Sequence, residues 1–249
     1  MSLDIKIVTS KRSLFDVDLA EIWRYRDLIV LFVKRDFIAV YKQTILGPIW
    51  FFVQPLFTTL MFTVVFGKLA DIPTDGIPNF LFYLSGITMW NYFSECTLKT
   101  SNTFVANSDL FGKVYFPRLV MPVSIVLSSL MKFGVQFLLF ILFYFYFYFY
   151  FSGADITPNF SACLLPVLII MMAFTGLGLG LLISSLTTKY RDLQFLIGFA
   201  IQLFMYATPV VYPLSLAKEK LGEYYWLTYF NPLSPIIETF KYGFLGKGN

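Results

Sequence analysis

Long apolar stretches alternate with short polar breaks along most of the chain. A membrane-spanning helix needs about 20 mostly apolar residues, and five stretches satisfy that requirement. They cover approximately residues 48–67, 80–105, 119–151, 163–186 and 193–212. The breaks are polar or contain Gly and Pro, as in Lys68–Asn79 and Gly153–Asn159. This pattern predicts one all-α, polytopic membrane unit with five visible transmembrane helices, no internal repeat and no soluble domain.

Basic residues are concentrated on one side of the predicted spans. The first 46 residues hold Lys6, Lys11, Arg12, Arg24, Arg26, Lys34, Arg35 and Lys42. Two alternate loops add Lys113, Arg118, Lys189 and Arg191, whereas the opposite loops hold only Lys68, Lys218 and Lys220. Because cytoplasmic loops are enriched in Lys and Arg, we predict a cytoplasmic N-terminus.

The N-terminal part differs from the spans because charges flank its apolar residues. Within Asp18–Ile45, the apolar run Leu28–Val33 is far too short to cross a bilayer. Such a segment is typical of an amphipathic helix that lies in the cytoplasmic interface. We therefore divide the chain into a cytoplasmic N-terminal segment, 1–46, and a transmembrane domain, 47–249, whose outer-side segment is 213–249.

The composition supports this class and excludes others. Of 249 residues, 57% are hydrophobic and 14% charged, whereas soluble domains are about 25% charged. The absence of histidine excludes a histidine-based triad and a two-histidine metal site. The formal net charge of +4 follows from the basic cytoplasmic side, so we expect no nucleic-acid partner. Cys96 and Cys163 are too few for a disulfide framework, and we expect both to be buried.

No motif for chemistry is present. The sequence contains no GxxxxGK[ST] phosphate-binding loop, and no carboxylate pair or cysteine cluster that would form a catalytic or metal site. We therefore expect no catalytic residue, no metal and no cofactor in this chain. Energy for uphill transport would then come from another subunit.

Polar residues recur every three or four positions in the second predicted span, so that they share one helix face. They are Ser85, Thr88, Tyr92, Glu95, Lys99 and Asn102. Polar groups at membrane depth normally face a water-filled cavity or the bundle interior, so this stripe either lines a transport pathway or makes contacts between helices. Glu95 and Lys99 have i,i+4 spacing for an ion pair, and Lys132 in the third span reaches a similar depth and is a second partner for Glu95.

Two further patterns have structural interpretations. Nine consecutive aromatic residues, Phe143–Phe151, lie at the outer end of the third span, where an aromatic belt at the headgroups is expected; stacking against sugars on an exit path is the alternative. Gly176 and Gly180 form the small-xxx-small pattern of closely packed membrane helices.

Two segments between or after the spans are rich in aromatic and charged residues. Asn107–Pro122 is either a docking element for a cytoplasmic partner or a basic anchor on that side. Glu223–Gly246 is too polar and too interrupted to span, so short interfacial or re-entrant helices are expected there. Its amphipathic aromatics suit either anchoring or an exit gate.

Five motifs in order resemble the ABC-2 type permeases that export O-antigen, capsule or teichoic-acid polysaccharides. The first is RDFIAVYKQTILGPIWFFVQPLF at Arg35–Phe57, and the second is GKVYFPRLVMP at Gly112–Pro122. The others are TTKYRDLQF at Thr187–Phe195, ATPVVYPLSL at Ala207–Leu216 and NPLSPIIETFKYGFLG at Asn231–Gly246. The resemblance covers nearly everything between Asp18 and Gly246.

The resemblance implies a homodimer of permease chains in the bacterial inner (plasma) membrane, in contact with membrane lipid. Two copies of a P-loop ATPase subunit, which bind ATP and Mg, would drive export of a lipid-linked polysaccharide through a central channel. A sixth family helix, which returns the C-terminus to the cytoplasm, is absent from this chain.

The resemblance also implies roles for individual residues. Together with the polar stripe it gives the substrate-channel candidates Trp50, Ser85, Thr88, Trp90, Tyr92, Phe93, Glu95 and Lys99. The exit-gate candidates are Tyr224, Tyr225, Trp226, Tyr229 and Phe230. The ATPase-docking candidates are Asp109, Phe111, Lys113, Tyr115, Phe116, Arg118, Tyr190, Arg191 and Asp192.

Two other functions remain open on the sequence alone. One is an ABC-2 permease for a different cargo, such as a lipid or a drug, since composition does not separate it from polymer export. The other is a membrane-embedded enzyme that acts on lipid-linked sugars with Glu95 as acid or base.

Overall fold

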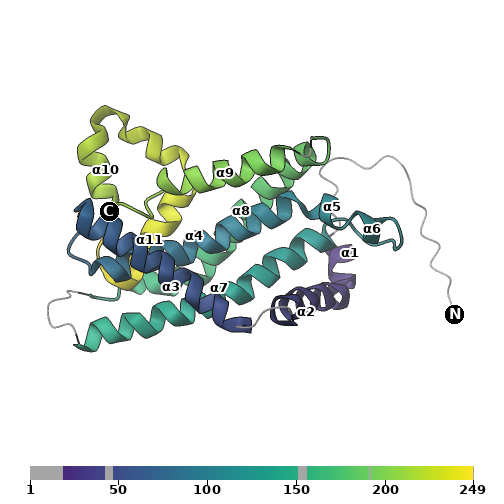
Figure 1. Ribbon diagram of the computed structural model, residues 1–249, viewed down its shortest axis with the longest axis horizontal. Coiled ribbons are helices and arrows are strands. Elements are labelled where there is room, and N and C mark those ends of the chain that lie inside the picture. Colours follow the sequence, from purple (N-terminus) through teal and green to yellow (C-terminus); the bar gives the residue numbers. More distant parts are fainter. Residues whose placement is uncertain (1–18, 43–46, 151–155, 191, 249) are drawn as a thin grey trace.

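The structure is a computed structural model that describes residues 19–42, 47–150, 156–190 and 192–248. These residues form helices joined by turns, with no strand among them (Figure 1). The described part of the chain therefore confirms the all-α prediction.

The long helices run roughly side by side along the longest dimension of the molecule (Figure 1). They are α3 (Trp50–Phe62, continued by the π-helix η2, Thr63–Leu69), α4 (Asn79–Ser101), α7 (Val120–Tyr150), α8 (Leu165–Thr187, preceded by the 3-10 turn η3, Phe160–Leu164) and α9 (Leu193–Tyr206).

Three of these stretches are long and apolar enough to cross a membrane. They are Trp50–Leu69, Val120–Tyr150 and Phe160–Thr187. Helix α9 is apolar but only 14 residues long, and α4 carries the polar stripe among its apolar residues. The described helices thus establish an integral membrane protein, and the count of five spans stays a prediction.

Short helices occupy the two ends of this bundle. One end, here called the α2 end, carries α1 (Leu19–Arg24), α2 (Arg26–Lys42), η1 (Gly47–Ile49), α5 (Thr103–Ala106) and α6 (Ser108–Phe111). The opposite end, here called the α10 end, carries α10 (Leu214–Leu221), η4 (Gly222–Phe230) and α11 (Leu233–Leu245). Figure 1 shows α5 and α6 toward one end of the long axis and α10 and α11 toward the other.

Helix α4 is the centre of the bundle. Every residue from Leu81 to Trp90 is buried, and α4 contacts α3, α7, α8, α9 and α11. This position explains how a helix with many polar residues can lie at membrane depth: protein surrounds most of it, so that its hydroxyl groups avoid the lipid.

Glycines on α8 allow its close approach to α4. A Cβ atom at Gly176 would lie 2.8 Å from Cβ of Cys96, and one at Gly180 would lie 2.6 Å from Cβ of Thr100. Real Cβ atoms do not approach so closely, so only glycine fits this helix contact. The packing interpretation of these two glycines is confirmed.

The two cysteines have different surroundings. Cys96 is buried in the contact between α4 and α8, as expected, whereas Cys163 in η3 is exposed. The expectation of burial was wrong for Cys163 because a turn that leads into an outer helix presents some of its apolar side chains outward, where the surface of a membrane protein is itself apolar.

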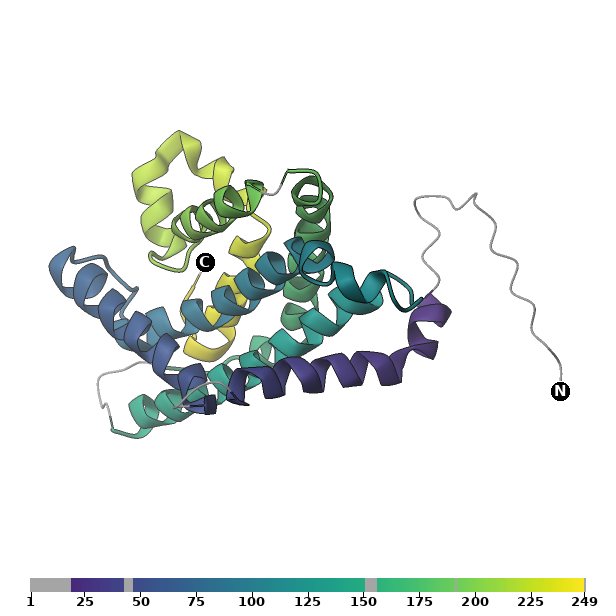
Figure 2. The same cartoon turned by 45° about the vertical axis from the view of Figure 1, so that its right-hand side comes forward.

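The N-terminal helical segment is interrupted at Tyr25, between α1 and α2. Ile29 and Phe32 of α2 are buried against Phe116 and Met121, and the rings of Phe32 and Phe116 are 5.9 Å apart. Helix α2 is foreshortened in Figure 1 and seen lengthwise in Figure 2, so it crosses the long helices at their end. Whether it lies in the membrane interface stays a prediction.

Candidate functional site

Glu95, Lys99 and Lys132 form what is here called the charged cluster. Nζ of Lys99 lies 2.5 Å from Oε1 of Glu95, one helical turn away. Lys132, from α7, pairs with the same oxygen atom, and its ammonium group lies 5.3 Å from the ring centroid of Phe51. Both ion pairs predicted for Glu95 are therefore present.

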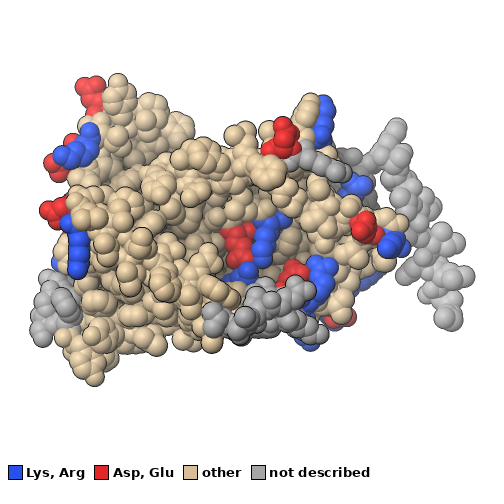
Figure 3. Space-filling view, viewed as in Figure 1, with Lys and Arg blue, Asp and Glu red and all other residues tan. Residues whose placement is uncertain are grey.

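Two ammonium groups share one carboxylate in this cluster, which leaves one positive charge in excess. The side chains of Lys132 and Glu95 are 18% and 21% exposed, and that of Lys99 is 43% exposed. A group of acidic and basic atoms stands within a broad uncharged face in Figure 3. Because an uncompensated charge away from water is costly, the partial exposure of Lys99 is what makes the excess charge tolerable.

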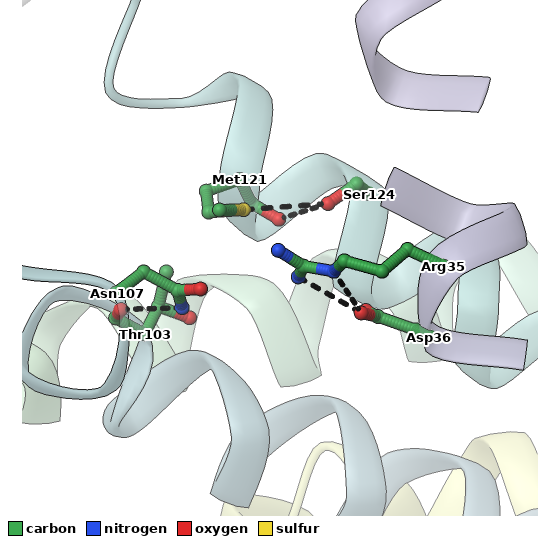
Figure 4. Close-up of polar contacts among 6 residues, drawn as sticks. All are labelled: Arg35, Asp36, Thr103, Asn107, Met121 and Ser124. Carbon is green, nitrogen blue, oxygen red and sulfur yellow. Dashed lines mark hydrogen bonds and ion pairs between the residues drawn. The ribbon is translucent and has the colours of Figure 1, made fainter. Parts of the chain in front are cut away.

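A cavity of about 420 Å³ lies beside the charged cluster, toward the α2 end. Lys99 lines it together with Arg35 and Asp36 of α2, Asn107 and Gln194. In Figure 4 the Arg35 side chain extends into the space between α7 and the α5 region, with its guanidinium bound to Asp36 at 2.9 and 3.0 Å. The cavity therefore joins the N-terminal helix to the only part of the polar stripe that carries charge.

Asn102, the last residue of the polar stripe, also lines this cavity, whereas Ser85, Thr88 and Tyr92 are buried. Ser85 and Thr88 are fully buried and donate to carbonyl groups of their own helix, those of Phe82 and Leu84, at 2.7 and 2.8 Å. Tyr92 is 3% exposed and packs against Phe133. For these three positions the structure agrees with contacts between helices, and only the end of the stripe near Glu95 reaches an accessible surface.

The aromatic channel candidates divide in the same way. Trp90 and Phe93 are buried, with ring centroids 6.0 and 6.3 Å from that of Phe204 on α9. Trp50 is 46% exposed at the start of α3. Within the chain, Trp90 and Phe93 thus fill the core, because α9 covers the face of α4 on which they lie.

The docking candidates gather at the α2 end. Most of them are exposed, namely Asp109, Lys113, Tyr115, Arg118, Tyr190 and Asp192, while Phe111 is half-buried. Phe116 is only 6% exposed, and its ring centroid lies 5.1 Å from that of Phe111. Its assignment to an exposed docking surface was therefore wrong, because its side chain packs inward and anchors the loop on α2. Arg191 lies outside the described residues.

The exit-gate candidates lie on η4, at the α10 end. Tyr224, Trp226, Tyr229 and Phe230 are more than half exposed. The rings pair along the helix, with 5.5 Å between the centroids of Tyr225 and Tyr229 and also between those of Trp226 and Phe230.

A second buried charged site, absent from the sequence predictions, lies on α11. Lys241 is 1% exposed and donates to the carbonyl oxygen of Pro209 at 2.6 Å. Its ammonium group lies 3.5 Å from the ring centroid of Phe82, and burial lowers the pKa of Lys241 to about 8. Glu238, also buried, accepts from the backbone N–H of Leu214 at 3.3 Å.

Asn231 completes this clamp on the turn after α9. Its side-chain amide donates to the carbonyl oxygen of Ala207 at 3.2 Å and to the hydroxyl of Thr208 at 2.9 Å. One signal was available: Glu238 and Lys241 fall at helical spacing on the same face as Ile237 and Leu245, which places two ionisable groups on the apolar face of α11.

The described helices and the charged cluster at membrane depth define an integral membrane protein without a metal-binding group of His, Cys, Asp or Glu among its described residues. The sequence profile of the ABC-2 type transporter family matches residues 27–245. The chain therefore belongs to the ABC-2 type transporter family.

Two relatives of known name are similar over most of their length. The O-antigen export system permease protein RfbA of Myxococcus xanthus is 27% identical over 222 residues, which cover 89% of this chain and 81% of that protein. A protein of the same name from Klebsiella pneumoniae is 28% identical over 217 residues, which cover 86% and 79%.

Proposed function

We propose that this chain is the membrane permease subunit of an ABC exporter that moves a lipid-linked polysaccharide out of the cell. The observation that carries this proposal is the continuous similarity to two O-antigen export permeases over more than four fifths of the chain. The ABC-2 family match over the same region supports it.

We further propose that the α2 end faces the cytoplasm. The exposed cations Arg24, Arg26, Lys34, Lys113 and Lys189 all lie on elements of this end or on the turns beside it. A cytoplasmic location agrees with the enrichment of Lys and Arg in cytoplasmic segments, and it places the α10 end outside.

ATP and Mg would be bound by a separate P-loop ATPase subunit, and the permease would act as a homodimer with two copies of that subunit. The exposed residues Lys113, Tyr115 and Arg118 form the proposed docking surface together with Tyr190 of the neighbouring turn. Because Phe116 in the same loop packs on Phe32 of α2, a force on the docking loop would be passed directly to the N-terminal helix.

The charged cluster and its cavity are then the part of the chain best placed to meet a charged portion of the cargo on the cytoplasmic side. Lys99 is the most exposed of the three charged side chains and also lines the cavity. Polar groups in such a position are normally kept for function, because they lower the stability of a membrane protein.

Co-purification with the ATPase encoded beside this chain tests the proposal. The double variant Lys113→Glu/Arg118→Glu should lower ATPase recovery at least about tenfold, since it replaces two attractive charges in the contact by repulsive ones. Cell-surface polysaccharide should fall with it. The matched control is Lys218→Glu/Lys220→Glu at the α10 end, which should leave ATPase recovery unchanged.

Two results would contradict the proposal. Equal recovery of the ATPase with both double variants would show that Lys113 and Arg118 are not part of a docking surface for the ATPase. A normal amount of surface polysaccharide in cells that lack this chain would show that polysaccharide is not its cargo. The chain would still belong to the ABC-2 type transporter family.

A further inference from the structure

A pocket of about 490 Å³ opens at the α10 end, between α10, η4 and α11. Its walls combine two tyrosine rings, those of Tyr225 and Tyr229, with hydroxyl and carboxylate oxygens. Ligand pockets typically have such a volume and combine apolar walls with a few polar groups. The helices that line this pocket, α10 and α11, lie at the α10 end (Figure 1), whereas the cavity beside the charged cluster is lined by residues of α2 and α5 at the α2 end.

The two tyrosine rings form a corner. Their centroids are 5.5 Å apart and their planes meet at 79°, so that they present two nearly perpendicular surfaces. Tyr229 is 75% exposed, which leaves its ring free to cover a ligand. An aromatic ring with a hydroxyl group offers an apolar face and a polar edge to the same partner.

The polar groups of the pocket have unused hydrogen-bonding capacity. The hydroxyl of Ser234, in a residue 3% exposed, is buried and has no hydrogen-bond partner within the described chain. Buried polar groups are nearly always paired, so this hydroxyl calls for a partner. Glu238 is 5% exposed and uses one oxygen to accept from Leu214, but a carboxylate can accept several hydrogen bonds.

These groups together select one kind of ligand. An ionised carboxylate only accepts, whereas a serine hydroxyl donates and accepts, so the ligand must carry O–H or N–H donors as well as acceptors. The carboxylate of Glu238 and the ammonium group of Lys218 both line the pocket, so neither sign of charge on a ligand is favoured, and the flat tyrosine faces favour a ligand with an apolar face. A sugar ring has both properties, because its hydroxyl groups lie at its edge and its C–H groups cover its faces.

We propose that this pocket binds a neutral sugar residue of the exported chain at the outer surface of the membrane. The identity of the cargo rests on the proposed function, but the pocket itself rests on the tyrosine corner, the unpartnered hydroxyl of Ser234 and the buried carboxylate of Glu238. The bound sugar would hold the emerging chain beside α11.

Binding of short neutral oligosaccharides to the full-length protein in nanodiscs tests this site. Maltotetraose and mannotetraose are the probes, and saturation-transfer NMR detects them even when affinity is weak. Tyr229→Ala and Glu238→Gln should each weaken binding about tenfold or more, because each removes a main contact of the site. Glu238→Gln keeps an oxygen for the N–H of Leu214, and because it also removes a negative charge near the buried Lys241, its thermal unfolding is measured beside its binding.

Tyr242→Ala is the matched control, because Tyr242 is an exposed tyrosine of α11 that does not line the pocket. Its binding should equal that of the unaltered chain. Tetragalacturonate and inorganic phosphate serve as anionic probes. Stronger binding of either one than of both neutral probes would overturn the proposal, and so would equal binding by Tyr242→Ala and Tyr229→Ala.

Failure of the pocket is distinguishable from failure of the proposed function. If the unaltered protein binds no sugar, and cells that carry Tyr229→Ala and Glu238→Gln export polysaccharide normally, the sugar site is excluded while the proposed export function stands. If instead deletion of the whole gene leaves surface polysaccharide unchanged, the proposed function is wrong whatever the binding result.

Discussion

Two lysines lie inside this bundle in contrasting surroundings. Lys241 at the α10 end is sealed, held by one carbonyl oxygen and one aromatic ring. Lys132 in the charged cluster also lies near a ring, that of Phe51, but it shares a carboxylate with Lys99 and keeps some exposure. The backbone and ring that hold Lys241 cannot be exchanged for water, whereas the ion pair of Lys132 can open and close.

The comparison separates a structural lysine from one suited to function. Lys241 fixes the turn after α9 against α4 and α11, so its contacts stabilise the packing of the α10 end. The charged cluster pairs side chains of α4 and α7, with the ring of Phe51 on α3 beside Lys132, and it borders a cavity. Low-cost rearrangement is therefore expected at the cluster and not at Lys241.

The largest effect is expected at Lys241. Lys241→Ala should lower the free energy of unfolding by about 3 kcal/mol or more, because it leaves a cavity and a buried carbonyl group without a donor. Thermal unfolding in detergent would measure it. Lys241→Met keeps the volume of the stem and should cost clearly less. Equal losses in the two variants would show that the cost comes from the missing hydrogen bond to Pro209 and not from packing, whereas no loss in either variant would contradict the structural role of Lys241.

An intermediate effect is expected at the charged cluster. Glu95→Gln should cost about 1 to 2 kcal/mol, because it leaves two cations without their shared carboxylate while partial exposure screens them. Adding Lys132→Gln should recover part of the loss, since one of the two repelling cations is then removed. A double-mutant cycle measures this coupling, and strictly additive losses would show that the three side chains do not act as a unit.

The smallest effect is expected at Lys189, which also lies over an aromatic ring, 5.0 Å from the centroid of Tyr190. Both residues are exposed. Lys189→Gln should change the free energy of unfolding by less than about 0.5 kcal/mol, as surface substitutions usually do. The same unfolding assay applies. A loss as large as that of Lys241→Ala would show that the ring contact, and not burial, determines the cost.

The lengths and positions of the apolar stretches in the sequence were sufficient to locate the long helices of the bundle. The apolar stretches begin and end close to the ends of α3, α4, α7, α8 and α9, and the spacing of Gly176 and Gly180 identified the contact between α4 and α8. These features depend on residues near one another in sequence, and for that reason they could be predicted.

The division of the polar stripe could not be predicted. Ser85 and Glu95 have the same periodicity, yet one is sealed and the other borders an accessible surface, because different helices cover the two ends of α4. Phe116 and Lys241 illustrate the same limit. Phe116 lies in a polar, aromatic segment and Lys241 is a charged residue on an otherwise apolar helix face, yet each is buried by an element distant in sequence, α2 in one case and the turn after α9 in the other.

The length of α7 has a consequence for the membrane in which this protein can reside. Its 31 residues span about 46 Å at 1.5 Å per residue, against a hydrocarbon thickness of about 30 Å. The surplus at the α10 end consists of phenylalanine and tyrosine, which tolerate both acyl chains and headgroups. In a thicker or thinner bilayer, the boundary between the acyl chains and the headgroups can lie at a different point along these aromatic residues. Hydrophobic mismatch therefore costs this helix little free energy.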